Sequence, residues 1–214
     1  MTNMVTKIDL RTNDTRKRII KEAQHLYQMG GYNQLSMDKI AEVLGLKRPT
    51  LYYHFPGGKE QLLVETLNIL TDELITAWEN AIRTGRDTRS RLRNILGSAP
   101  YYSMTENKRT FLYELWQLSE EVKTAVKQSY EKVFDLLAQV FKEGMEKGEI
   151  REVELEIAMH SFFAIFDQVE NMVTVRELFP ELGHNANTFE LEVLIDKIFN
   201  LWMTGLLVPV SPSS

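Results

Sequence analysis

The sequence predicts an all-α fold, and three observations carry that prediction. Apolar residues recur three and four positions apart in almost every segment, which is the spacing that gives a helix one apolar face. The 214 residues include only 11 glycines and 6 prolines, fewer turn-forming residues than a sandwich or a barrel needs. Hydrophobic residues make up 43% and charged residues 26%, a balance that supports a packed core and argues against a wholly disordered chain.

Composition also narrows the function classes. Cysteine is absent, which excludes disulfides, thiolate metal sites and cysteine nucleophiles. Residues 1–30 contain no secretory apolar segment, and no apolar run approaches the ~18 residues that a membrane helix needs. We therefore expect a cytoplasmic protein with no membrane partner, no metal and no cofactor.

Charge divides the chain into two parts. Residues 1–60 contain 10 Lys and Arg against 6 Asp and Glu, whereas residues 61–214 contain 15 against 24. Such asymmetry indicates two regions with different partners. The basic region is suited to a polyanion, although an excess of this size is also a common fluctuation.

The N-terminal region begins with two helical patterns. Thr15 is placed to cap a helix that runs to about residue 29, where the glycine pair at 30–31 ends it. Ser36 then opens a short helix with an apolar face, and Gly45 ends that helix.

A third short helix is predicted over residues 49–54, with Pro49 in its first turn and the segment 56–58, Pro-Gly-Gly, breaking it. Two short helices joined by a glycine turn, with another helix before them, are the pattern of a three-helix helix-turn-helix domain. In that unit the second short helix presents its N-terminal side chains to the DNA major groove.

Beyond residue 59 the chain reads as a helical bundle. A helix over about 59–84 repeats apolar residues with a spacing near 3.5 and crosses the point where the charge changes sign. We therefore divide the chain into a helix-turn-helix domain over 1–72 and a helical ligand-binding and dimerisation domain over 73–214. Further helices are predicted over 87–102, 106–118, 120–147 (with Ser119 as its N-cap), 154–178 and 188–206.

The segment 45–60, GLKRPTLYYHFPGGKE, supplies what a groove-reading helix needs. Basic side chains at its start can reach phosphates or guanine edges, and tyrosine and histidine tips suit backbone contacts. Leu51 and Phe55 would anchor the helix inward. Each polar residue has an alternative interpretation as a solvated or, for Tyr52, a packing residue. The candidate DNA-binding residues are Lys47, Arg48, Thr50, Tyr52, Tyr53, His54 and Lys59.

Residues 15–63 resemble the DNA-binding domain of the TetR/AcrR family of transcriptional regulators. The pattern is a first helix ending in Gly-Tyr, then Ser-Met-x-x-Ile-Ala, a glycine turn, Thr-Leu-Tyr-Tyr-His-Phe, and Lys-Glu opening the linking helix. The resemblance implies a homodimer that binds a palindromic DNA operator, usually as a repressor, and whose C-terminal domain binds a small molecule. It places the seven residues above where members of the family contact DNA.

Three positions depart from the family pattern. Lys47 replaces the Ser that caps the recognition helix in many members, so a charge stands where a cap is common. Asp38 stands where some members have a base-reading Arg. The loop 56–58 is one residue longer than the commonest form, which we interpret as a turn variant.

The last two predicted helices are the candidate dimer interface. Residues 155–178 are apolar around most of the helix, and the final helix is apolar as well, so in a monomer one face would stay exposed. Pairing these helices across two subunits makes a four-helix core. The candidate interface residues are Ala164, Gln168, Leu191, Leu194, Ile198, Leu201 and Trp202.

Aromatic residues of the second domain could line an effector pocket for an apolar or aromatic small molecule, with ordinary core as the alternative for each of them. Asp167, Gln168 and His160 interrupt an apolar helix and could anchor the polar end of a ligand or face the dimer partner. The candidate pocket residues are Trp78, Tyr102, Phe111, Trp116, Tyr130, Phe134, Phe163 and Asp167.

Two rival classes are weaker. An enzyme is disfavoured because the four histidines are scattered and no HExxH, phosphate-binding loop or GxSxG motif occurs. A helical protein-interaction or small-molecule-binding module without DNA specificity explains the amphipathic helices but not the composition of the recognition helix.

Overall fold

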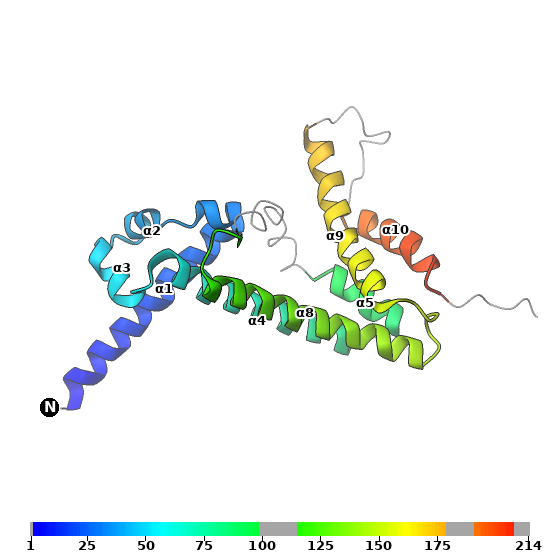
Figure 1. Cartoon of the computed structure of the whole chain (residues 1–214), viewed down its shortest axis with the longest axis horizontal. Helices are drawn as coiled ribbons and strands as arrows, with labels where there is room; N and C mark the ends of the chain where they lie inside the picture. The colour runs from blue at the N-terminus through cyan, green and yellow to red at the C-terminus, as the bar shows by residue number, and fades with distance from the viewer. Residues whose placement is uncertain (1, 99–114, 179–190, 208–214) are drawn as a thin grey trace, which may run out of the picture. The chain divides into compact units, whose positions relative to one another are not determined.

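The computed structural model describes residues 2–98, 115–178 and 191–207, and most of them are helical. Eight helices are defined within these ranges, labelled α1 to α5 and α8 to α10 (Figure 1). Over the same ranges, strand-like pairing is limited to one antiparallel bridge between Ile150 and Leu207. The all-α prediction is confirmed.

The chain divides into two compact units. The first contains the residues up to Asp72 and, of the later described residues, 115–130; the second contains the rest. The helices α4 and α8 each pass from one unit into the other. The functional division into residues 1–72 and 73–214 stays a prediction. In the described part of the chain, no helix is long and apolar enough to cross a membrane.

The first helix is longer than the sequence predicts. Helix α1 covers Thr2–Gln34, so Thr15 lies inside it and is not its N-cap. Residues 2–12 belong to this helix as well, and neither proline nor glycine interrupts the chain before Gly30. The glycine pair ends the regular helix as predicted: Gly31 has φ 63°, a backbone conformation that favours glycine.

The two short helices form as predicted. Helix α2, Met37–Leu44, is capped by Ser36, whose hydroxyl accepts a hydrogen bond from the Lys39 amide at 3.4 Å. Gly45 ends it with φ 64°. Helix α3, Arg48–His54, follows after a short turn and packs against α2, as Figure 1 shows.

One apolar core fixes these helices in the first unit. Leu51 of α3 and Phe55, its C-cap residue, are fully buried, and burial of each large apolar side chain contributes about 1.5–3 kcal/mol. Helix α4, Gly58–Thr84, adds Leu62 and Leu63 to this core. The first half of α8, Glu120–Glu146, lies beside α4 in this unit and joins the same core through Val122 and Val126, as does Leu118 just before the helix.

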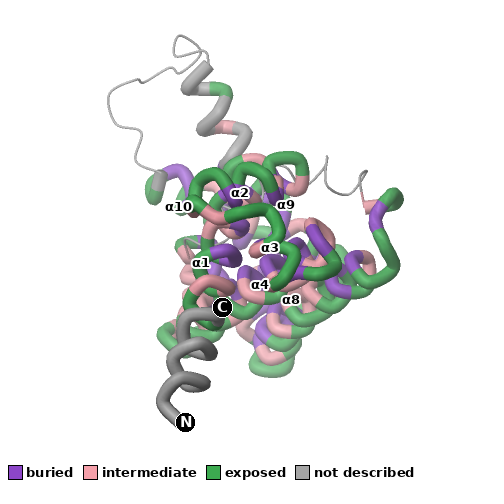
Figure 2. Tube along the Cα trace, turned by 90° about the vertical axis from the view of Figure 1, so that its left-hand side faces the viewer, coloured by how far each residue is buried: buried purple, intermediate pink, exposed green. Residues whose placement is uncertain are grey.

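The second unit has its own core, built from α5, α9, α10 and the later parts of α4 and α8. Helix α5, Thr88–Leu96, is shorter than the predicted 87–102 because Gly97 follows its last turn. Helices α9, Leu155–Leu178, and α10, Leu191–Thr204, agree with their predictions within a few residues, as does α8. The helix predicted over 106–118 falls mostly outside the described residues. Buried and exposed residues alternate along α4 and α8, as amphipathic helices require (Figure 2).

Candidate nucleic-acid interface and effector region

The candidate interface is the outer face of α2 and α3. Lys47 occupies the N-cap position of α3 in extended backbone conformation, and its side chain makes no capping hydrogen bond. Lys47, Arg48 and Pro49 are all exposed. The first turn of α3 therefore presents two basic side chains and uncapped amide groups, which together favour an anion.

Arg48 is exposed but has two neighbours. Its guanidinium Nη1 lies 3.4 Å from Oδ1 of Asp38 in α2. Its Cζ lies 5.8 Å from the centre of the Tyr52 ring, within the range of a cation–π contact. The side chain is thus oriented on the surface and still accessible.

The other α3 residues differ in exposure. Tyr53 is 74% exposed, whereas Tyr52 is 39% exposed and packs near the start of α4, where a Cβ on Gly58 would lie 3.4 Å from its Cε1. Thr50 is half-buried. Tyr52 therefore combines packing with an accessible hydroxyl, and Tyr53 is the more accessible of the two tyrosines.

His54 is half-buried and contacts the Tyr53 ring edge-on, with 5.3 Å between ring centres. Burial lowers the pKa of His54, and the nearby positive charge of Arg16 lowers it further. The imidazole is therefore neutral around pH 7, so it can donate a hydrogen bond from its N–H group without adding a charge.

Arg16 connects three helices of the first unit. It forms an ion pair with Glu65 of α4, and its guanidinium lies 5.0 Å from the centre of the buried Phe55 ring. Of the basic run at residues 16–21, Arg16 is thus engaged in holding α1 to α3 and α4. The other basic residues of the run, Lys17, Arg18 and Lys21, are exposed.

Lys59 stands in the first turn of α4. Its Nζ lies 3.5 Å from the centre of the Tyr32 ring, which follows the glycine pair at the end of α1. The turn before α4 is closed by hydrogen bonds from the Gly58 amide to the Phe55 carbonyl at 2.9 Å and from the Gly57 amide to Oε1 of Gln61 at 2.9 Å. The ammonium group therefore lies at a defined place beside a helix N-terminus.

In the second unit, three of the predicted pocket residues lie together. Phe163 stacks on Phe134 with ring centres 5.1 Å apart and on Trp78 at 6.0 Å. Trp78 also stacks on Phe166 at 6.5 Å. Trp78 and Phe163 are buried members of the second core, in keeping with the interpretation of these rings as core.

The other predicted pocket residues that the structure describes lie outside that cluster. Trp116 is 81% exposed and belongs to the first unit. Tyr130 also belongs to the first unit. There the burial of Tyr27 raises the pKa of the Tyr27 phenol, and the nearby Tyr130 phenol raises it further. Asp167 is exposed on α9. Tyr102 and Phe111 lie outside the described residues.

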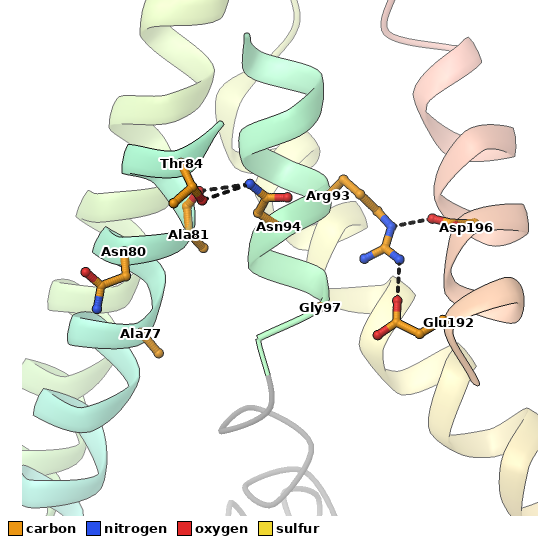
Figure 3. Close-up of a pocket in the computed structure, with 9 residues that line it drawn as sticks. All are labelled: Ala77, Asn80, Ala81, Thr84, Arg93, Asn94, Gly97, Glu192 and Asp196. Carbon is orange, nitrogen blue, oxygen red and sulfur yellow. Dashed lines mark hydrogen bonds and ion pairs between the residues drawn. The ribbon is translucent and has the colours of Figure 1, made fainter. Parts of the chain in front are cut away.

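A groove of about 720 Å³ opens between α4, α5 and α10 (Figure 3). Arg93 of α5 forms ion pairs with Glu192 at 2.7 Å and with Asp196 on one side of it. Asn94 donates to the Thr84 hydroxyl at 3.1 Å on the other side. Polar and small apolar residues line the groove together, and none of the described lining residues is aromatic. The lining is Ala77, Asn80, Ala81, Thr84, Arg93, Asn94, Gly97, Glu192 and Asp196.

The candidate dimer residues divide between core and surface. Leu194 is buried, and Trp202 is half-buried and donates from Nε1 to the Ser161 hydroxyl at 3.1 Å. Ile198 is half-buried, and the side chain of Leu191 lies outside the described residues. The candidate residues exposed on α9 and α10 are Ala164, Gln168 and, at 81% exposure, Leu201.

Sequence reasoning missed the partners of the interface residues. From the sequence, Asp38 was noted only because some family members have a base-reading arginine at its position. Tyr32 was noted only as part of the Gly-Tyr motif, and Arg16 only as one member of a basic run. Their contacts join residues far apart in the chain, and no local spacing signals them. An aromatic residue beside the glycine pair was the one available hint for Tyr32.

The fold and this basic face together define a helix-turn-helix DNA-binding protein of the transcription-regulator class. Comparison with known families agrees, since residues 19–66 match the family model described as bacterial regulatory proteins, tetR family. Residues 19–66 therefore form a DNA-binding domain of this family.

The similarity to curated relatives covers only part of each relative's length. The chain is 44% identical to the HTH-type transcriptional regulator LmrA of Bacillus subtilis over 55 residues, 26% of this chain and 29% of LmrA. It is 30% identical to the HTH-type transcriptional activator FasR of Mycolicibacterium smegmatis over 135 residues, 59% of this chain and 60% of FasR. The chain thus covers less than two thirds of either relative.

A solved structure supports the fold of both units. The transcriptional regulator FadR from Bacillus subtilis, in complex with stearoyl-CoA, aligns with a TM-score of 0.63 and 22% identity. The alignment covers 88% of this chain and 98% of FadR. At this identity the likeness concerns the fold alone.

Proposed function

We propose that this chain is a ligand-responsive transcriptional repressor that binds a palindromic DNA operator as a homodimer in the cytoplasm. The observation that carries the proposal is the start of α3, where Lys47 and Arg48 are exposed on a helix that the fully buried Leu51 and Phe55 hold in place. Long basic side chains at a recognition-helix start reach base edges and phosphates.

The seven candidate residues then have different roles. Lys47 and Arg48 stand where base edges are closest, with Thr50 and the exposed Tyr53 beside them. Tyr52, the neutral His54 and Lys59 come later and contact phosphates. No catalytic residue is part of this proposal.

Dimer formation is supported by exposed apolar side chains on the two last helices. Ile157 and Val175 of α9 are 62% and 44% exposed, and Val193 and Leu201 of α10 are 40% and 81% exposed. Apolar side chains of this size at the surface of two neighbouring helices suit an interface. A two-fold axis would then set two α3 helices roughly 34 Å apart, one DNA turn.

The effector site is assigned to the second unit. Its aromatic and aliphatic core favours an apolar ligand, and FadR, the solved relative, holds stearoyl-CoA. Helix α4 carries Lys59 at one end and Trp78 in the second core, so a ligand that displaces the later part of α4 acts on the DNA-binding end. Linkage requires that operator and effector change each other's affinity by the same factor.

The DNA-binding proposal is tested by selection from a random duplex pool with the full-length chain. We expect enrichment of a two-fold symmetric site, with binding that weakens steeply as salt is raised. If the chain binds no duplex above background, or binds all sequences equally, the alternative of a helical interaction module without DNA specificity is favoured instead.

The regulatory proposal is tested with a reporter gene behind the selected site and with stearoyl-CoA and free coenzyme A as ligands. A repressor lowers reporter expression, whereas an activator raises it. An effector that binds the second unit and leaves operator affinity unchanged would contradict the coupling.

A further inference from the structure

The carboxylate of Asp38 and the guanidinium of Arg48 connect α2 and α3 at the proposed DNA-binding face. Oδ1 and Nη1 are 3.4 Å apart, and the side chains are 68% and 62% exposed. An exposed ion pair of this kind adds little to stability. Its position, rather than its strength, is the feature that needs explanation.

Asp38 stands on a surface that phosphates approach. A carboxylate there repels DNA of every sequence, so by itself it lowers affinity without adding discrimination. It also stands in the first turn of α2, where the helix dipole favours a negative charge, and it lies within ion-pair distance of Arg48.

Arg48 is restrained on two sides. Asp38 accepts one edge of the guanidinium, and the Tyr52 ring lies 5.8 Å from Cζ. A free arginine at a helix start swings to the nearest phosphate, which carries no sequence information. An arginine held by a carboxylate keeps its other N–H groups for the N7 and O6 acceptors of guanine.

We propose that Asp38 is a positioning residue that directs Arg48 to a guanine and so sets operator specificity. This inference rests on the proposed function, because it needs a DNA site that the chain recognises. It assigns α2 an indirect part in base reading, although α2 has no base-reading arginine of its own.

The experiment compares Asp38→Asn with Glu42→Gln in the full-length chain. Both residues are exposed acids of α2, so the two changes remove the same charge from the same helix. The probes are the duplex that the wild-type chain selects from a random pool and a scrambled duplex of equal composition. Each affinity is measured over a salt titration.

We expect both variants to bind the scrambled duplex more tightly than wild type, because each lacks one repelling charge. Asp38→Asn alone should lower the ratio of selected to scrambled affinity, by about 5–10-fold, and relax the preference at one base pair in each half-site. Asp38→Glu should retain most of that preference. In an Arg48→Ala background, Asp38→Asn should cause no further loss of specificity.

An affinity ratio for Asp38→Asn equal to that for Glu42→Gln would overturn the proposal and leave the proposed function standing. A full additional loss in the Arg48→Ala background would also overturn it, since Asp38 would then act independently of Arg48. Failure of the wild-type chain to select any sequence would instead remove the proposed function itself, and this inference with it.

Discussion

The ammonium Nζ of Lys59 lies 3.5 Å from the centre of the Tyr32 ring, at the point where α4 begins. The ring holds a cation beside the N-terminus of a helix, so charge and dipole both favour an anion at one place. A DNA phosphate satisfies this arrangement without regard to the base that it carries.

Lys59→Ala should therefore weaken binding to selected and scrambled duplexes by the same factor. The slope of log affinity against log salt should fall by about one unit per subunit, because one phosphate contact is lost. Lys142→Ala, which removes an exposed charge from the second unit, is the control and should change neither quantity appreciably. A change in base preference for Lys59→Ala would show that this residue reads sequence.

Arg48→Ala should act differently, because the first turn of α3 reaches base edges. We expect a loss of about 1–3 kcal/mol per half-site on the selected duplex, a relaxed preference at one base pair, and a smaller loss on the scrambled duplex. Salt titrations on both duplexes measure this difference. Equal losses on the two duplexes would make Arg48 a phosphate clamp and assign base reading to Lys47, Thr50 or Tyr53.

Lys47→Ser should stabilise the protein while it weakens DNA binding. Lys47 provides no side-chain hydrogen bond at the N-cap of α3, and serine at an N-cap contributes about 0.5–2 kcal/mol. Denaturant unfolding should show that gain, and the salt slope should fall because a positive charge is lost. Lys47→Ala is the matched control, since it removes the charge without supplying a cap. Loss of stability in Lys47→Ser would contradict the capping argument.

Leu201→Glu should convert the proposed dimer to a monomer. Leu201 is 81% exposed in the single chain, so a charge is tolerated there unless a partner covers it. Sedimentation of the full-length chain measures the change, and operator binding should fall with it. Met29→Glu, at a 63% exposed position of α1, should leave the oligomeric state unchanged. A dimer that survives Leu201→Glu would place the interface elsewhere.

Glu149→Gln should reduce stability in a pH-dependent manner. Hydrogen bonds that the Thr88 hydroxyl and amide donate to Oε2, each 2.6 Å long, lower the pKa of Glu149. A lowered folded-state pKa means that the stabilisation is fully present above the ordinary glutamate value, near 4.5, and is lost as pH falls through the folded value.

We therefore expect Glu149→Gln to lower the free energy of unfolding by about 1 kcal/mol at pH 7. The loss is smaller than for a fully buried charged hydrogen bond, because the carboxylate is partly exposed. The difference from wild type should disappear at strongly acidic pH. Urea unfolding at a series of pH values measures it, with the exposed Glu146→Gln as control. A difference that stays constant with pH would exclude the carboxylate as its source.

Much of the fold was predictable because its signals are local. Ser36 caps α2, and the glycines at 31 and 45 adopt positive φ, as their sequence positions indicate. The apolar period then places Leu51 and Phe55 inside, and so places Lys47 and Arg48 outside. Each of these features depends on residues within one or two helical turns of one another.

Where local signals conflicted or were missing, prediction was wrong. Thr15 resembles an N-cap, but the chain before it contains no breaker and α1 continues to Thr2. Asp167 interrupts an apolar stretch of sequence, and the structure places it on the exposed side of α9. A pattern that is apolar almost all round does not tell which side meets the core.

The sequence by itself determined the helices, the inward anchors of α3 and the exposed basic start of that helix. Only the tertiary structure decided that Asp38 meets Arg48, that Tyr32 lies under Lys59, and that residues 115–130 join the first core. The reason is physical. Backbone hydrogen bonds and dihedral limits act over a few residues and are written in local spacing, whereas the choice of a distant partner depends on how whole helices pack.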